Sequence, residues 1–261
     1  MIGLGKTAIV RGGGDLATGV IYRLWRAGFR TLSLEVETPL VVRRTVSVAD
    51  AVFNGNCTVD GMPVHFIRSI NEIDAHNGVS IIVDPNAKSI AIMHPDIVVD
   101  AIMAKRNIGT TIDMAPLVIA IGPGFTAKKD VHFVVETKRG HYLGHLISEG
   151  SAIPNTGVPG MEMGHSTERL LRSPCKGHLK PLKNIGDHVE AGEIVGTVGK
   201  CAVYAAISGM LRGLIHPSVL VTRGLKIGDI DPRDEQSHCF SITDKALAVA
   251  GGVMEAICMS I

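Results

Sequence analysis

Residues 7–17 read TAIVRGGGDLA and carry the clearest local signal for the fold. Thr7 to Arg11 is rich in β-branched residues, which favours a strand, and the glycines after it favour a sharp turn. From Leu16 to Ala27 the apolar residues recur at helical spacing, and Thr31 to Val36 is typical of a second strand. The stretch therefore predicts a β-loop-α-β unit.

The turn in this unit matches a phosphate-binding pattern. Gly12, Gly14 and Ala17 have the spacing G-x-G-x-x-A, in which glycines let the backbone approach a pyrophosphate at a helix N-terminus. Glu35 or Glu37 follows where an acid could hold a ribose hydroxyl. The pattern predicts a Rossmann-like α/β domain that binds a nucleotide or a related cofactor.

Asp15 keeps a second interpretation open, in which the glycines only form a tight turn. Its carboxylate stands beside the supposed phosphate and is unfavourable there unless a cation or a ligand donor lies close by. The residues expected to contact the cofactor are Gly12, Gly13, Gly14, Asp15, Leu16, Thr18, Glu35, Asp100, Lys105, Asn107, Gly122 and Gly124.

Three later segments also resemble strands that end in polar loops: 79–83, 97–99 and 117–121. Ligands collect at the carboxyl ends of parallel strands, so the loop 105–113 is a candidate wall of the site. Arg106 would contact an anion there, and Asp113 would act as acid, base or metal contact. The alternative is a solvated loop in which Asp113 caps a turn.

His141 is a further candidate for the reactive end of the ligand. His145 lies four residues later, but flanking glycines disfavour a regular helix, and no carboxylate or cysteine stands at a familiar ligand spacing. We therefore expect no metal site. The candidate catalytic residues are Asp113, His141 and Arg106.

Charge and composition narrow the classes of function. Lys and Arg number 26 against 25 for Asp and Glu, and no basic run with interleaved aromatic residues is present, so nucleic acid is not an expected partner. No apolar run is long enough for a membrane span, and the N-terminus has no leader pattern, which predicts a cytoplasmic protein. The five cysteines are widely spaced, as is typical of reduced thiols.

The C-terminal half contains an internal repeat. Residues 174–198 align with residues 206–230 at one constant offset, which matches Gly177 with Gly209 and Val189 with Val221. Two such halves, with glycine turns and alternating aliphatic residues, predict an all-β barrel-sandwich hybrid of the biotinyl/lipoyl type. The hairpin between the halves holds Lys200, which lacks the flanking residues of a modified lysine, so we expect no biotin or lipoate.

These observations predict four consecutive parts of the chain. They are a Rossmann-like cofactor-binding domain at 1–150, a turn-rich connector at 151–170, the barrel at 171–233, and a C-terminal segment at 234–261 whose helix packs back on the first domain.

Several short motifs, taken in order, resemble the YqeB family. The stretches are 11–19 (RGGGDLATG), 99–107 (VDAIMAKRN), 122–127 (GPGFTA), 139–141 (RGH), 155–157 (NTG) with 159–160 (PG), 226–233 (KIGDIDPR), 243–246 (TDKA) and 250–253 (AGGV). Members of this family are accessory proteins of selenium-dependent molybdenum hydroxylase systems. The resemblance implies a role in maturing or supplying the cofactor of a xanthine-dehydrogenase-like enzyme of purine metabolism that carries a labile selenium ligand.

Taken together, the motifs and the resemblance predict an accessory factor that binds a nucleotide or the molybdenum cofactor at the glycine turn. Its expected partners are the hydroxylase client, the selenium and molybdenum cofactor machinery and a small phosphate-bearing ligand, with a homo-oligomer as a further option. Two alternatives stay open: an NAD(P)-linked oxidoreductase, and a non-catalytic scaffold that docks to the hydroxylase.

Overall fold

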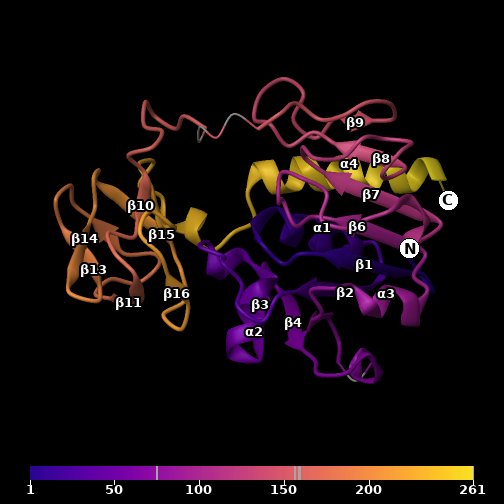
Figure 1. Ribbon diagram of the computed structural model, residues 1–261, viewed down its shortest axis with the longest axis horizontal. Helices are drawn as coiled ribbons and strands as arrows, with labels where there is room; N and C mark the ends of the chain where they lie inside the picture. The colour runs from indigo at the N-terminus through magenta and orange to yellow at the C-terminus, as the bar shows by residue number, and fades with distance from the viewer. Residues whose placement is uncertain (75, 156, 158–159, 261) are drawn as a thin grey trace. The chain divides into compact units, whose positions relative to one another are not determined.

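The computed structural model describes residues 1–74, 76–155, 157 and 160–260. The chain divides into two compact units, each built from separate stretches of sequence (Figure 1). The first unit comprises Met1–Glu37, Val48–Thr156 and Ile242–Ile261, and the second comprises Thr38–Ser47 and Gly157–Ser241. Of the connector proposed from sequence, Thr156, Val158 and Pro159 lie outside the described residues.

The first unit is built on a nine-stranded sheet with the order β3-β4-β5-β2-β1-β6-β7-β8-β9. The strands from β4 to β8 in this order run parallel, while β3 and β9 pair antiparallel at the two edges. Their bounds are β1 Thr7–Arg11, β2 Arg30–Glu35, β3 Asn56–Val59, β4 Met62–Phe66, β5 Val79–Val83, β6 Ile97–Asp100, β7 Leu117–Ile121, β8 Phe133–Val135 and β9 Leu146–Ile147.

The core of this unit follows from the strand sequences. The interior strand β7 reads LVIAI and is buried at every residue, as expected for a parallel strand covered on both faces. Helix α1 (Asp15–Arg26) follows β1, and helix α4 (Asp244–Ser260) lies beside α1 (Figure 1). The other helices are short: α2 is Ala51–Asn54 and α3 is Lys88–Met93.

The second unit holds two four-stranded sheets, with the orders β10-β17-β15-β12 and β14-β13-β11-β16. The aligned repeats exchange strands, because β11 pairs with β16 of the other repeat and β15 pairs with β12. The bounds are β10 Leu170–Arg172, β11 Gly177–Pro181, β12 His188–Val189, β13 Ile194–Val198, β14 Cys201–Tyr204, β15 Gly209–Leu214, β16 Leu220–Val221 and β17 Lys226–Asp231.

The fold class expected from sequence is wrong for both halves. The first sheet is mixed, and most connections between its strands in the described chain are loops or 3-10 turns such as Ile70–Glu72 and Ile112–Met114, where a Rossmann fold alternates strands with helices. In the second unit the strands form two separate sheets that include β10, and the segment 38–47 also packs there. The arrangement is not a clear biotinyl/lipoyl barrel.

No helix in the described part of the chain is both long and apolar enough to cross a membrane.

Candidate functional site

The parallel strands of the first unit bring several of the proposed site residues to one edge of the sheet. Arg11 at the end of β1 is opposite Asp100 at the end of β6, and Ile121 at the end of β7 is opposite Val135 of β8. Gly12 and Gly122 each follow the last residue of a strand at this edge. Helix α1 also begins here, so this carboxyl edge is where ligands usually bind in open α/β sheets.

The glycine turn already makes internal hydrogen bonds. The N–H of Gly12 donates to the Leu34 carbonyl at 2.7 Å, and that of Gly13 donates to Glu35 Oε2 at 2.8 Å. Gly12 has φ +104°, and a Cβ there would lie 2.9 Å from the Ala101 carbonyl oxygen, so the backbone packs too tightly for a side chain. Two amides of the proposed phosphate loop are therefore used by the protein itself.

Glu35 holds this turn in place. Its Oε1 accepts the N–H of Val36 at 2.8 Å, while its Oε2 accepts that of Gly13. Burial raises the pKa of the Glu35 carboxyl, and the two backbone hydrogen bonds partly oppose that rise. Both carboxylate oxygens have protein partners, and the proposed contact with a ribose hydroxyl stays a prediction.

The polar side chain of Thr18, near the start of α1, makes hydrogen bonds within the protein. The Thr18 hydroxyl donates to the Gly14 carbonyl at 2.8 Å and accepts the N–H of Val48 at 3.0 Å. Asp15 and Leu16 are half-buried in the first turn. The first N–H groups of a helix have no partner within it, so the amides of this turn are the donors that an anion could use.

Asp100 belongs to a buried polar cluster. Its Oδ2 lies 3.5 Å from Arg11 Nη1, and the Thr110 hydroxyl contacts both side chains. Burial raises the pKa of Asp100, while the hydrogen bond from Thr110 lowers it. Asn107 shapes the same loop, because its Oδ1 accepts the N–H groups of Gly109 at 2.9 Å and Thr110 at 2.8 Å. These contacts fix the loop to the sheet.

Gly124 lets the loop 105–113 pack against the segment that follows β7. It has φ +113°, and a Cβ there would lie 2.7 Å from the backbone of Arg106. Gly122, with φ +76°, similarly faces the Met103 side chain and the Thr137 hydroxyl. Lys105 and Arg106 remain exposed. Gly124 thus allows close packing of two backbone segments, and Gly122 allows side chains to pack against the backbone.

The three residues proposed as catalytic are exposed and lie apart from one another. In the described part of the chain, no hydrogen bond, ion pair or ring contact joins Asp113, His141 and Arg106. The Thr111 hydroxyl donates to Asp113 and lowers the pKa of its carboxyl. The His141 ring meets that of Tyr142 edge-on, with centroids 5.0 Å apart. Their joint action in catalysis stays a prediction.

Lys245 is a site residue that sequence reasoning missed. It is the second residue of α4 and is half-buried. Burial lowers the pKa of its ammonium group, and the charge of Arg139 lowers it further, while Asp15, Glu136 and Asp244 oppose the shift. Among the described residues, its Nζ has no hydrogen-bond or ion-pair partner. A partly desolvated cation at a helix N-terminus favours an anionic ligand.

An ion pair and several hydrogen bonds hold the side chains around Lys245 in place. Arg139 Nη1 lies 3.1 Å from Asp244 Oδ2. The buried Glu136 carboxylate accepts the N–H groups of Thr137, Lys138 and Ile153, each at 2.7 Å. The stretch 243–246 drew attention in the sequence only as part of a family pattern. Its position at the site could be seen only once α4 was placed beside α1.

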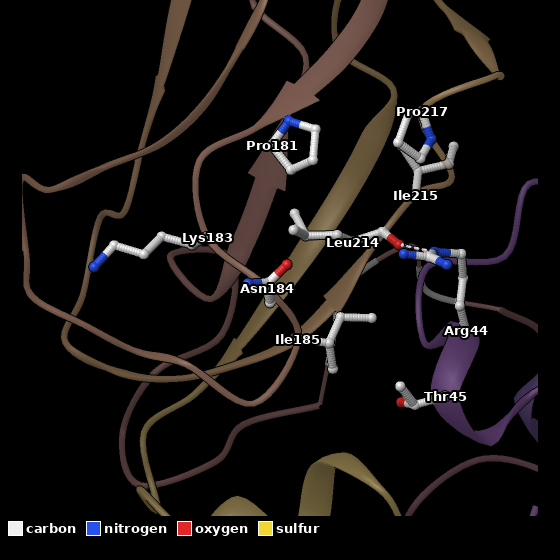
Figure 2. Close-up of a pocket in the computed structure, with 9 residues that line it drawn as sticks. All are labelled: Arg44, Thr45, Pro181, Lys183, Asn184, Ile185, Leu214, Ile215 and Pro217. Carbon is white, nitrogen blue, oxygen red and sulfur yellow. Dashed lines mark hydrogen bonds between the residues drawn. The ribbon is translucent and has the colours of Figure 1, made fainter.

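A cavity of about 230 Å³ lies in the second unit (Figure 2). On one side of the cavity, Arg44 Nε donates to the Leu214 carbonyl at 2.8 Å. Lys183 points away from the centre of the cavity, and its Nζ lies 2.5 Å from Glu193 Oε1. Its described lining carries no carboxylate, thiol or imidazole. Of the side chains suited to acid-base chemistry, its described lining holds Lys183, and that ammonium group is paired with Glu193. The described residues also hold no cluster of three or more His, Cys, Asp or Glu arranged for a metal ion.

Comparison of the sequence with known proteins places the chain in a family. No protein-family model matches it. It is 46% identical over 257 residues to the uncharacterized protein YqeB of Escherichia coli (strain K12), an alignment that covers 97% of this chain and 48% of that protein. The chain belongs to the YqeB family. It spans about half the length of the curated relative it matches.

Solved structures give only weak similarity. A succinylglutamate desuccinylase/aspartoacylase from Rhodobacter sphaeroides has a TM-score of 0.28 at 16% identity, covering 87% of this chain and 85% of that one. An aspartoacylase family protein from Mesorhizobium loti has a TM-score of 0.28 at 13% identity, with the same coverage. These neighbours give no support to the Rossmann-like and biotinyl/lipoyl expectations, and scores this low carry no inference about activity.

Proposed function

We propose that this chain is a cytoplasmic accessory protein that binds a phosphate-bearing nucleotide or cofactor and helps to mature a selenium-dependent molybdenum hydroxylase. The motifs shared with the YqeB family support the link to that system. The observation that carries the ligand class is Lys245, a half-buried ammonium group without an ion-pair partner among the described residues, at the carboxyl edge of the sheet.

The charge of Lys245 favours an anionic ligand. Removing a lysine from water disfavours its charged form, which is why burial lowers the pKa of Lys245. An anion bound beside it would restore the lost stabilisation of the charge. Arg139 adds a second positive charge close by, and its Nη1 lies 3.1 Å from Asp244 Oδ2. The pair of cations suits a group with more than one negative charge, such as a phosphate.

Backbone N–H groups at the start of α1 would also bind the ligand. Because the amides of Gly12 and Gly13 bind Leu34 and Glu35, the ligand would use the remaining amides at the first turn of α1. Helices α1 and α4 pack side by side. Together these groups would bind and orient the phosphate end of the ligand and exclude water from it.

The same contacts explain why this function is preferred over an NAD(P)-linked oxidoreductase. That alternative rests on the G-x-G-x-x-A spacing, in which the glycine backbone approaches the pyrophosphate. Here Gly12 and Gly13 approach other parts of the protein, namely Ala101 and Ala49. No contact in the described structure favours hydride transfer.

The test is elemental analysis of the hydroxylase purified from a strain of the host that lacks this protein. We expect a folded but inactive enzyme with reduced selenium, molybdenum or both, because a labile selenium ligand must be placed while the cofactor is shielded from water. Selenium loss alone assigns the protein to the selenium step, and loss of both assigns it to cofactor delivery.

Complementation makes the test specific to the site. A Lys245→Ala gene should fail to restore the metal and selenium content, whereas Lys6→Ala should restore it, because Lys6 precedes β1 at the opposite edge of the same sheet. A hydroxylase with full molybdenum, full selenium and normal turnover in the deletion strain rules out the maturation role.

A further inference from the structure

Two thiols meet at one end of a sheet in the second unit, whereas the site described above belongs to the first unit. Cys175 lies in the loop before β11, and Cys201 is the first residue of β14, just after the hairpin turn at Gly199 and Lys200. Both cysteines are free and partly exposed. They are 26 positions apart in sequence, so the fold alone brings them together.

Val198 connects the two cysteines. The Cys175 thiol donates to the Val198 carbonyl at 2.9 Å, and Val198 is paired directly with Cys201 across the β13–β14 hairpin. A Cβ built on Gly199 would lie 3.8 Å from Cys175 Sγ. Cys201 lies close enough to perturb the Cys175 thiol: its side chain, together with burial, raises the pKa of that thiol, and its backbone N–H partly opposes the rise. The two cysteines therefore lie side by side where the loop before β11 meets the β13–β14 hairpin.

The remaining cysteines have different surroundings. Burial, together with the charge of Asp50, raises the pKa of Cys57 to about 12, which suppresses its thiolate. Cys239 is fully buried, and burial also raises the pKa of its thiol. Cys258 is exposed near the end of α4, in the first unit. Among the described residues, Cys175 and Cys201 are thus the cysteines that are both accessible and next to another thiol.

We propose that Cys175 and Cys201 form a dithiol site that reacts with small disulfides and closes into an intrachain disulfide. The thiolate of one cysteine attacks the small disulfide, forms a mixed disulfide and releases one small thiol. The second cysteine then attacks the protein sulfur of that mixed disulfide and releases the other small thiol. The two electrons and the two thiol protons leave with the released thiols, so the exchange is balanced and a dithiol reductant reverses it.

Charge at the site favours an anionic disulfide as the reactant. Lys176 follows Cys175 and Lys200 precedes Cys201, and both lysines are exposed. An anionic small disulfide such as glutathione disulfide would therefore be attracted to the hairpin. A disulfide between Cys175 and Cys201 would link the loop before β11 covalently to the β13–β14 hairpin and fix one end of this sheet.

The test treats the full chain with glutathione disulfide under native conditions and then blocks the remaining thiols with an alkylating agent. We expect an intact mass lower by two hydrogen atoms before alkylation, and a single cross-linked peptide that joins Cys175 to Cys201. Cys175→Ser and Cys201→Ser should instead each gain one glutathionyl group at the remaining cysteine. Cys258→Ser, which removes an exposed thiol elsewhere, should close as the wild type does.

Peptide mapping of the wild type decides the outcome even if a serine variant folds poorly. The proposal is overturned if both cysteines of the wild type accumulate glutathionyl groups without a cross-link, if neither reacts, or if the cross-link joins a different pair. Oxidised wild type should also show a higher melting temperature than reduced wild type, and the Cys201→Ser variant should show no such rise.

Discussion

At the scale of single residues, the most informative groups are charged side chains that are buried in the protein. In the second unit, Asp229 and Asp231 are almost completely buried in β17, and Arg212 of β15 holds both. Its Nη2 lies 2.5 Å from Asp229 and its Nη1 lies 3.1 Å from Asp231. The sequence showed Asp229 and Asp231 only as part of a family pattern and Arg212 only as part of a repeat, because spacing does not reveal which charges pair across strands.

Substitution of Arg212 by alanine tests this network. It removes the counter-ion that the two buried carboxylates share, although Lys226 still lies near Asp229 and Arg233 near Asp231. Breaking a buried ion pair typically costs about 3–5 kcal/mol. We therefore expect the free energy of unfolding to fall by about that amount in urea titrations. Arg172→Ala, on the exposed surface of β10, should change it by less than about 0.5 kcal/mol.

Acid should unfold the second unit through the same residues. Burial raises the pKa of Asp231, but the hydrogen bonds and charges of Arg233 and Arg212 outweigh that effect and leave the pKa at about 2, below the ordinary 3.8. A depressed folded-state pKa stabilises the protein above the ordinary value, and that stabilisation is lost as the pH falls from about 4 to about 2. Stability that stays constant across this range, measured by denaturant titration, would contradict the assignment.

At the scale of elements, the packing of α4 on α1 decides where the candidate site is built. Several strands could be predicted: 7–11, 79–83 and 117–121 match β1, β5 and β7. The antiparallel edge strands and the helix-poor connections could not, since both depend on pairing between segments far apart in sequence. Lys245 reaches the site only through α4, which explains why local patterns missed it.

Gly19 allows that packing, and its substitution tests the arrangement. A Cβ on Gly19 would lie 2.7 Å from the Ala246 carbonyl oxygen, so Gly19→Val should push the helices apart and lower stability by about 1–3 kcal/mol or more. Gly251 on α4 is the matched control, because a Cβ added there would meet no other atom within 4 Å. Gly251→Ala should be neutral or stabilising by up to about 1 kcal/mol. Equal effects of the two changes in thermal unfolding would contradict the close contact.

At the scale of the whole molecule, the two units draw on discontinuous parts of the chain. Residues 38–47 belong to the second unit although first-unit segments flank them, and residues 242–261 return to the first unit after the second is complete. The sequence analysis predicted that the C-terminal helix packs back on the first domain, but composition and motif spacing describe consecutive segments and did not place residues 38–47 in the second unit. The repeat at 174–230 was visible in sequence, but the pairing of its strands into two sheets was not.

The central claim is that the first unit binds a phosphate-bearing anion at Lys245. Native mass spectrometry of the full chain purified from its own host tests it most directly, with wild type, Lys245→Ala and Lys6→Ala compared under the same conditions. We expect a retained small molecule on wild type and Lys6→Ala, and occupancy reduced about tenfold or more on Lys245→Ala, because a hydrogen bond to a charged group contributes about 1.5–3 kcal/mol. Equal occupancy on Lys245→Ala and wild type, or no retained molecule on any of the three, would contradict the account.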